Sequence, residues 1–136
     1  MATISTEQAL VYAMLTMSAV DGRIRDGELD RVGKVVQSLP AFRQFDPERL
    51  TTVAQECGEM LQSPEGLDAV LGLIKDALPA RLRETAYALA VEVAVADLMV
   101  KREEIRFLAR LRDTLGLDKL VTSAIERAAV ARHASL

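Results

Sequence analysis

Four acidic residues recur in two pairs and offer the clearest chemistry in this chain. Asp21 precedes Glu28 by seven positions, and Asp97 precedes Glu104 by the same interval, 76 positions further on. Four carboxylates in close contact would repel one another, and some would hold protons unless a cation lay among them. Oxygen ligands select hard ions, Ca²⁺ or Mg²⁺, over Zn²⁺ or Cu²⁺. If the two segments meet, we expect a divalent-cation site at these four residues.

Each acid also has a simple structural explanation. Asp21 precedes Gly22, and an aspartate in a turn can accept hydrogen bonds from nearby backbone amides. Glu28 and Glu104 fall in the first turns of expected helices, where a negative charge interacts favourably with the helix dipole. Turn and helix chemistry does not require the same spacing twice, so the repetition favours a common role for the set.

The first copy has part of the pattern of an EF-hand calcium loop. Gly22 and Glu28 have the spacing of that loop's glycine and closing glutamate. Met17 and Ala19, however, stand where oxygen ligands would be needed, and Leu98 replaces the glycine in the second copy. Neither copy is an EF-hand, so a cation would need ligands from both segments or from water.

The remaining reactive side chains do not form a catalytic set. The chain has one histidine, His133, which falls in an expected C-terminal tail and should be exposed to solvent. Cys57 lies on an apolar helical stripe and is expected in the core, while Glu92 is expected to be a partnered, half-buried acid. No Ser-His-Asp or Cys-His arrangement can be assembled, and the glycines form no phosphate-binding fingerprint. We therefore expect a protein that is not an enzyme.

Composition excludes several further classes. The chain has 136 residues, is 50% hydrophobic and carries a formal net charge of −3, which argues against nucleic-acid binding. Its longest apolar stretch, 86–100, contains Glu92 and Asp97 and is shorter than the roughly 20 residues of a membrane span. The N-terminal residues lack the pattern of a secretory signal. These features predict a soluble, cytoplasmic protein with no membrane insertion.

Hydrophobic residues recur with helical periodicity throughout, and no alternating strand pattern competes with it. Ser5 and Gln8 have the spacing of a capping box, Asp46-Pro47 and Ser63-Pro64 have the composition of helix starts, and Gly116 is typical of a helix end. The pattern predicts an all-α single-domain bundle of about seven helices, near residues 5–20, 26–39, 47–61, 64–78, 80–96, 101–115 and 118–132.

The acidic repeat extends into the helices that follow it. Val32, Val35 and Leu39 correspond in register to Leu108, Leu111 and Leu115. We therefore predict an internal two-fold repeat of helix-loop-helix units, covering about 5–62 and 80–134 and linked by a helix at about 64–78. The helix at 80–96 is apolar on most sides and is predicted to be a central, buried helix.

The segment 19–29, Ala-Val-Asp-Gly-Arg-Ile-Arg-Asp-Gly-Glu-Leu, resembles the A-x-A-D-G-x-I-x-x-x-E signature of the TerB-like family, the tellurite-resistance group. The same fold occurs in the N-terminal region of DjlA-like co-chaperones. The second copy, Asp97 to Glu104, and the closing 115–117, Leu-Gly-Leu, fit the second half of that family's pattern. The resemblance covers nearly the whole chain in layout, but its specific motifs cover only about twenty residues.

The resemblance implies an all-helical, internally duplicated, cytoplasmic fold. It implies that Asp21, Glu28, Asp97 and Glu104 bind a divalent cation, and that the protein acts in tellurite or general chemical stress with protein partners at the inner face of the membrane. The alternative is a metal-free interaction scaffold or co-chaperone-like adaptor. In that case the acidic residues serve only as turns and caps, and the sixth helix or an apolar groove docks a protein partner.

Overall fold

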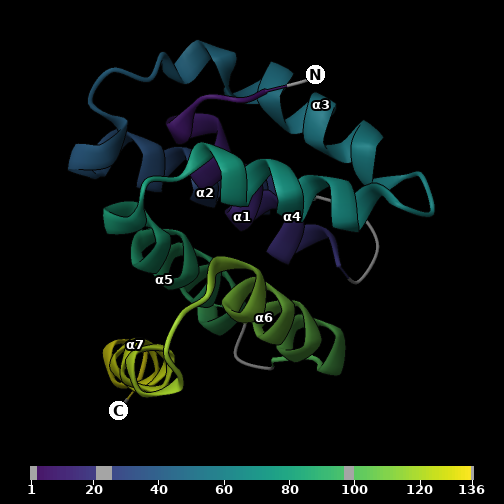
Figure 1. Cartoon of the computed structure of the whole chain (residues 1–136). Coiled ribbons are helices and arrows are strands. Elements are labelled where there is room, and N and C mark those ends of the chain that lie inside the picture. Colours follow the sequence, from purple (N-terminus) through teal and green to yellow (C-terminus); the bar gives the residue numbers. More distant parts are fainter. Residues whose placement is uncertain (1–2, 21–25, 97–99, 136) are drawn as a thin grey trace.

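The described residues form seven α-helices and two short 3₁₀ helices (Figure 1). The structure is a computed structural model that describes residues 3–20, 26–96 and 100–135, and these residues contain no strand. The all-α prediction is therefore confirmed. The helices are α1 (Thr6–Ala19), α2 (Asp26–Ser38), η1 (Pro40–Phe42), η2 (Pro47–Arg49), α3 (Leu50–Leu61), α4 (Gly66–Ala77), α5 (Ala80–Ala96), α6 (Arg102–Leu115) and α7 (Lys119–Arg132).

Local signals set several helix ends as predicted. Ser5 and Gln8 form a capping box, in which the Gln8 N–H donates to Ser5 Oγ at 3.1 Å and the Ser5 N–H donates to Gln8 Oε1 at 2.8 Å. Gly116 ends α6 in the left-handed conformation, with a φ of 68° that favours glycine. These bonds satisfy backbone groups that a helix end leaves without an intrahelical partner.

The two Pro-containing start signals act differently from the prediction. Asp46 Oδ1 accepts the Glu48 N–H at 3.0 Å, but it caps the 3₁₀ helix η2, and α3 begins after it at Leu50. Ser63 caps no helix start, because its hydroxyl donates back to the Met60 carbonyl at 3.2 Å and so closes the end of α3.

The turn between α3 and α4 depends on a glycine. A Cβ built on Gly66 would lie 1.7 Å from the Met60 carbonyl oxygen, so the two helices approach too closely for any side chain there. The fourth helix therefore begins at Gly66, two residues later than the predicted start at Pro64.

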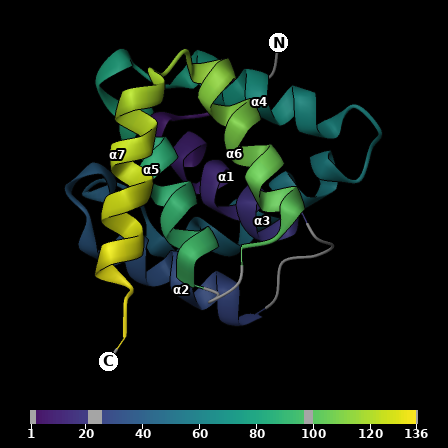
Figure 2. The same ribbon diagram turned by 90° about the horizontal axis from the view of Figure 1, so that it is seen from below.

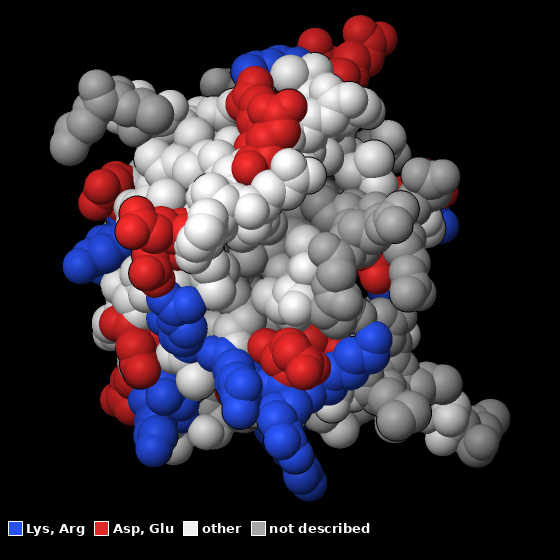
Figure 3. Space-filling model, turned by 90° about the vertical axis from the view of Figure 1, so that its right-hand side faces the viewer, with Lys and Arg blue, Asp and Glu red and all other residues white. Residues whose placement is uncertain are grey.

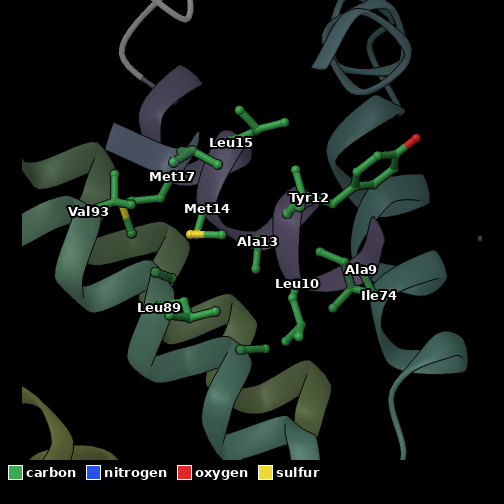
Figure 4. Packing of buried hydrophobic residues seen from close by; sticks show 14 of the residues in the cluster. Ala9, Leu10, Tyr12, Ala13, Met14, Leu15, Met17, Ile74, Leu89 and Val93 are labelled. Carbon is green, nitrogen blue, oxygen red and sulfur yellow. The ribbon is translucent and has the colours of Figure 1, made fainter. Parts of the chain in front are cut away.

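Helix α1 occupies the centre of the bundle. All ten residues from 9 to 18 are buried, and α1 contacts each of the helices from α2 to α6. Figure 4 shows Met14 and Met17 on the side of α1 that faces Leu89 and Val93 of α5, with Tyr12 on the other side. Because residues 9–18 include no charged side chain, this helix can be buried on every side.

The fifth helix is, as predicted, a buried helix, although α1 is buried over a longer continuous stretch. Helix α5 is largely buried and packs mainly on α1, α6 and α7, but charged side chains such as Glu84 and Glu92 keep part of it near solvent. Helix α7 lies on the outside of α5, with only Thr122 and Ala129 fully buried. The structure does not confirm the two-fold repeat, which remains a prediction.

Candidate functional site

The four predicted site residues divide into two that the structure describes and two that it does not. Asp21 and Asp97 lie outside the described residues. Glu28 lies in the first turn of α2 and is half-buried. Glu104 lies in the first turn of α6 and is only 6% exposed, an unusual degree of burial for a carboxylate.

Glu104 has a structural role at the start of its helix. The Lys101 N–H donates to Glu104 Oε1 at 3.0 Å, so the side chain reaches back over the first turn to the residue that precedes α6. This is the glutamate half of a capping box. The sequence signal was a glutamate three positions after the N-cap, but Lys101 at the cap concealed it because serine or threonine is usual there.

The helix ends that flank the two acidic segments lie on the same side of the molecule. Ala19 and Val20 at the end of α1 share a pocket with Glu103 and Phe107 at the start of α6. Helix α2 likewise shares a groove with the C-terminal half of α5. Figure 2 shows the end of α1, the start of α2, the end of α5 and the start of α6 gathered in one part of the structure.

The described residues alone do not assemble a metal site. Within 3–20, 26–96 and 100–135, no group of three or more His, Cys, Asp or Glu side chains is close enough to hold a metal ion. Glu28 and Glu104 supply the hard oxygen donors that Ca²⁺ or Mg²⁺ prefers, but a cation would also need donors from Asp21 and Asp97. The oxygen donors of Glu28 and Glu104 fit the predicted ion, and the other two predicted ligands, Asp21 and Asp97, lie outside the described residues.

A family model described as tellurite resistance protein TerB matches residues 7–127. The chain belongs to the TerB family. The match extends from the start of α1 into α7 and includes both acidic segments. Comparisons with curated proteins and with solved structures each returned no match.

In this TerB chain, Glu92 is a partnered acid, as predicted. It forms an ion pair with Arg132, and the Nε2 atom of His133 lies 2.7 Å from Glu92 Oε2. These contacts attach the end of α7 to α5. The contact of His133 with Glu92 could not be predicted from the sequence, because helical periodicity does not show which side chain the residue after a helix will reach.

Two other buried side chains of the TerB chain, Cys57 and Tyr87, have structural roles. Cys57 is fully buried beside Thr16 Oγ1, at 3.7 Å, and burial raises the pKa of its thiol to about 11. A protonated, inaccessible thiol is a poor nucleophile, which confirms Cys57 as a core residue. Tyr87 donates to Glu126 Oε2 at 2.5 Å, and burial, followed by this carboxylate, raises the pKa of its phenol. That bond also joins α5 to α7.

None of the helices in the described parts of the chain is both long and apolar enough to cross a membrane.

Proposed function

We propose that this TerB chain is a non-enzymatic helical module of a tellurite- or stress-response system. It binds one divalent cation, Ca²⁺ or Mg²⁺, through Asp21, Glu28, Asp97 and Glu104. The module works in the cytoplasm and presents its surface to protein partners, including partners at the inner face of the membrane.

The observation that carries the proposal is the common location of the helix ends around both acidic segments. Since Ala19 and Val20 share a pocket with Glu103, the end of α1 adjoins the start of α6. The two acidic segments are therefore attached to helix ends that lie close together. Glu104 adds a carboxylate that α6 already holds in a buried position at its N-terminus, where the helix dipole favours negative charge.

A cation at this position would have a mechanical effect on the bundle. We call residues 21–28 the α1–α2 corner and residues 97–104 the α5–α6 corner. Ligands from both corners would connect them through the cation, so cation binding would stabilise their relative position. At neutral pH, a bound Ca²⁺ or Mg²⁺ would also relieve the electrostatic repulsion among four carboxylates more effectively than proton uptake would. The module would then present one fixed surface to its partner when the cation is bound.

Thermal unfolding of chelator-stripped protein tests the proposal. Ligand at a hundred times its dissociation constant adds about 2.7 kcal/mol of stability, so millimolar Ca²⁺ or Mg²⁺ should raise the unfolding midpoint by several degrees. The double variant Asp21→Asn plus Asp97→Asn should lose the increase. An unchanged midpoint at millimolar concentrations of both ions would refute the proposal, and an increase that persists in the double variant would place the ion elsewhere.

A second candidate function is a metal-free interaction scaffold or co-chaperone-like adaptor. The hydrogen bond from Lys101 to Glu104 favours it, because this bond explains one of the four acids by helix capping alone. The thermal experiment separates the two functions, since a scaffold whose acids serve only as turns and caps gains no stability from either ion.

A further inference from the structure

A pocket of about 370 Å³ opens between α1, the α3–α4 turn and the first half of α6. Its volume lies within the range of roughly 300–1,000 Å³ that is usual for ligand sites. The walls are mostly apolar, and two of the lining residues, Thr16 and Phe107, are almost completely buried. The apolar walls are Ala19, Val20, Leu61, Leu67 and Phe107.

The mouth of the pocket carries positive charge from α6. Arg102, Arg106 and Arg110 follow at intervals of four residues and therefore lie on one face of the helix, and all three are exposed. Arg106 and Arg110 line the pocket itself. Figure 3 shows basic side chains gathered along the part of this surface that α6 occupies, with acidic side chains between them.

The two arginines at the mouth differ in their present contacts. Arg110 pairs with Asp68 of α4, but both side chains are largely exposed, so the pair is weak and can be exchanged. Arg106 forms no hydrogen bond or ion pair with any other described residue. At least one guanidinium group is therefore available beside an open apolar cavity, on a chain whose net charge is −3.

The acidic neighbours of these arginines restrict the choice of ligand. Glu103 also lines the pocket, and Asp68 lies beside Arg110. A nucleic-acid backbone or an anionic membrane would bring continuous negative charge against both carboxylates. A peptide can place separate carboxylates on the arginines and leave the Glu103 side of the mouth uncharged.

We infer that this pocket is the docking site for an acidic segment of a partner protein. One bulky apolar side chain of the segment fills the cavity above Phe107, and Asp or Glu residues beside it pair with Arg106 and Arg110. An apolar anchor in a pocket with charged groups at its edge is the usual arrangement of a binding hot spot and its rim. The pocket adjoins the proposed cation site, because Val20 and Glu103 precede Asp21 and Glu104 in sequence, but neither Glu28 nor Glu104 lines it. Peptide binding to the pocket requires no cation, so its test can succeed or fail independently of the cation proposal.

Selection from a random peptide library displayed on phage, against the immobilised full chain, tests this inference. The selected peptides should combine Asp or Glu with Leu, Ile, Met or Phe. Their affinity, measured by fluorescence anisotropy, should fall as salt rises, since exposed charge pairs are screened. The double variant Arg106→Glu plus Arg110→Glu should weaken binding by about tenfold or more.

Two further variants distinguish the site from a general effect of charge. Arg81→Glu plus Arg127→Glu makes the same charge change at exposed positions away from the pocket and should leave binding within about twofold. Ala19→Phe should fill the cavity and abolish binding with the arginines intact. Circular dichroism would verify that each variant is folded. Failure to enrich acidic apolar peptides, enrichment of basic ones, or equal losses in the two double variants would overturn the inference.

Discussion

Helices α1 and α5 begin the two halves of the predicted repeat, yet their surroundings differ. Helix α1 is buried over ten consecutive residues and contacts the five helices that follow it. Helix α5 packs mainly on α1, α6 and α7, and it holds the end of α7 through Glu92. One half therefore supplies the centre of the bundle, and the other supplies the attachment for its outer helices.

The order of burial is reversed for the two glutamates, Glu28 and Glu104, that follow the acidic segments. Glu28 is half-buried in α2, whereas Glu104 is buried in α6. Similar sequence spacing has thus been placed in two different environments. The two copies of the motif keep the same acidic side chains in different surroundings, so we expect them to contribute differently to stability.

The largest expected effect is in the centre of α1. Leu10→Ala should lower the free energy of unfolding by about 3–5 kcal/mol, because Leu10 is fully buried and its neighbours cannot all move into the cavity. Leu82→Ala in α5 should lose about half as much or less, since Leu82 is only half-buried. Urea unfolding of both variants gives the comparison. Equal losses would contradict the central position of α1.

The next effect concerns α4, which packs on α1 and α3 in the first half and on α6 in the second. Gly66→Ala should lower the free energy of unfolding by about 1–3 kcal/mol, because the new Cβ would collide with the Met60 carbonyl. Gly72→Ala in the same helix has open space and should stabilise by roughly 0.5–1 kcal/mol, because alanine is the better helix former. Urea unfolding would show opposite signs, and a loss in both would mean that helix propensity is not decisive at Gly72.

A smaller difference is expected between the two corner glutamates. In chelator, Glu104→Ala should lose about 1–3 kcal/mol, because it removes a buried acceptor of a backbone N–H. Glu28→Ala should lower the free energy of unfolding by less than Glu104→Ala does, because Glu28 is half-buried and an acceptor nearer to solvent is less costly to remove. Glu103→Ala, at an exposed neighbouring position, serves as the control. Equal losses of stability in Glu28→Ala and Glu104→Ala would show that the two glutamates contribute equally to the fold, against this prediction.

The smallest effect is expected at the contact between α4 and α6. Asp68→Ala removes the ion pair with Arg110, and since both partners are largely exposed the loss should stay within about 0.5 kcal/mol. Chemical unfolding at low and high salt is the measurement. A loss above about 1.5 kcal/mol would show that this surface pair fixes α6 to the first half.

Local sequence signals predicted most of the fold, including the burial of α5, but not the greater burial of α1. Ser5, Gly116 and the apolar stripes place helices through short-range chemistry, and the structure confirms them. The central position of α1 depends on packing between helices distant in sequence, which periodicity does not reveal. The absence of charge across residues 9–18 was the available signal.

The sequence predicted less of the candidate site than of the fold. The sequence identified Glu104 as a first-turn acid but did not show its bond to the Lys101 backbone, because a lysine is not a usual cap. The pocket beside Arg106 forms only when α1, the α3–α4 turn and α6 meet. Its apolar walls come from three separate segments, so no single motif could have indicated it.

Calorimetric titration of Ca²⁺ into chelator-stripped protein tests the central claim most directly, with Asp21→Asn and Asp97→Asn measured as single variants. If both corners hold one cation, the native chain binds about one ion, and either substitution alone weakens that binding by tenfold or more. Two ions per chain, with one lost in each variant, would show that the corners act separately. Absence of binding at millimolar Ca²⁺ and Mg²⁺ would contradict the cation site altogether.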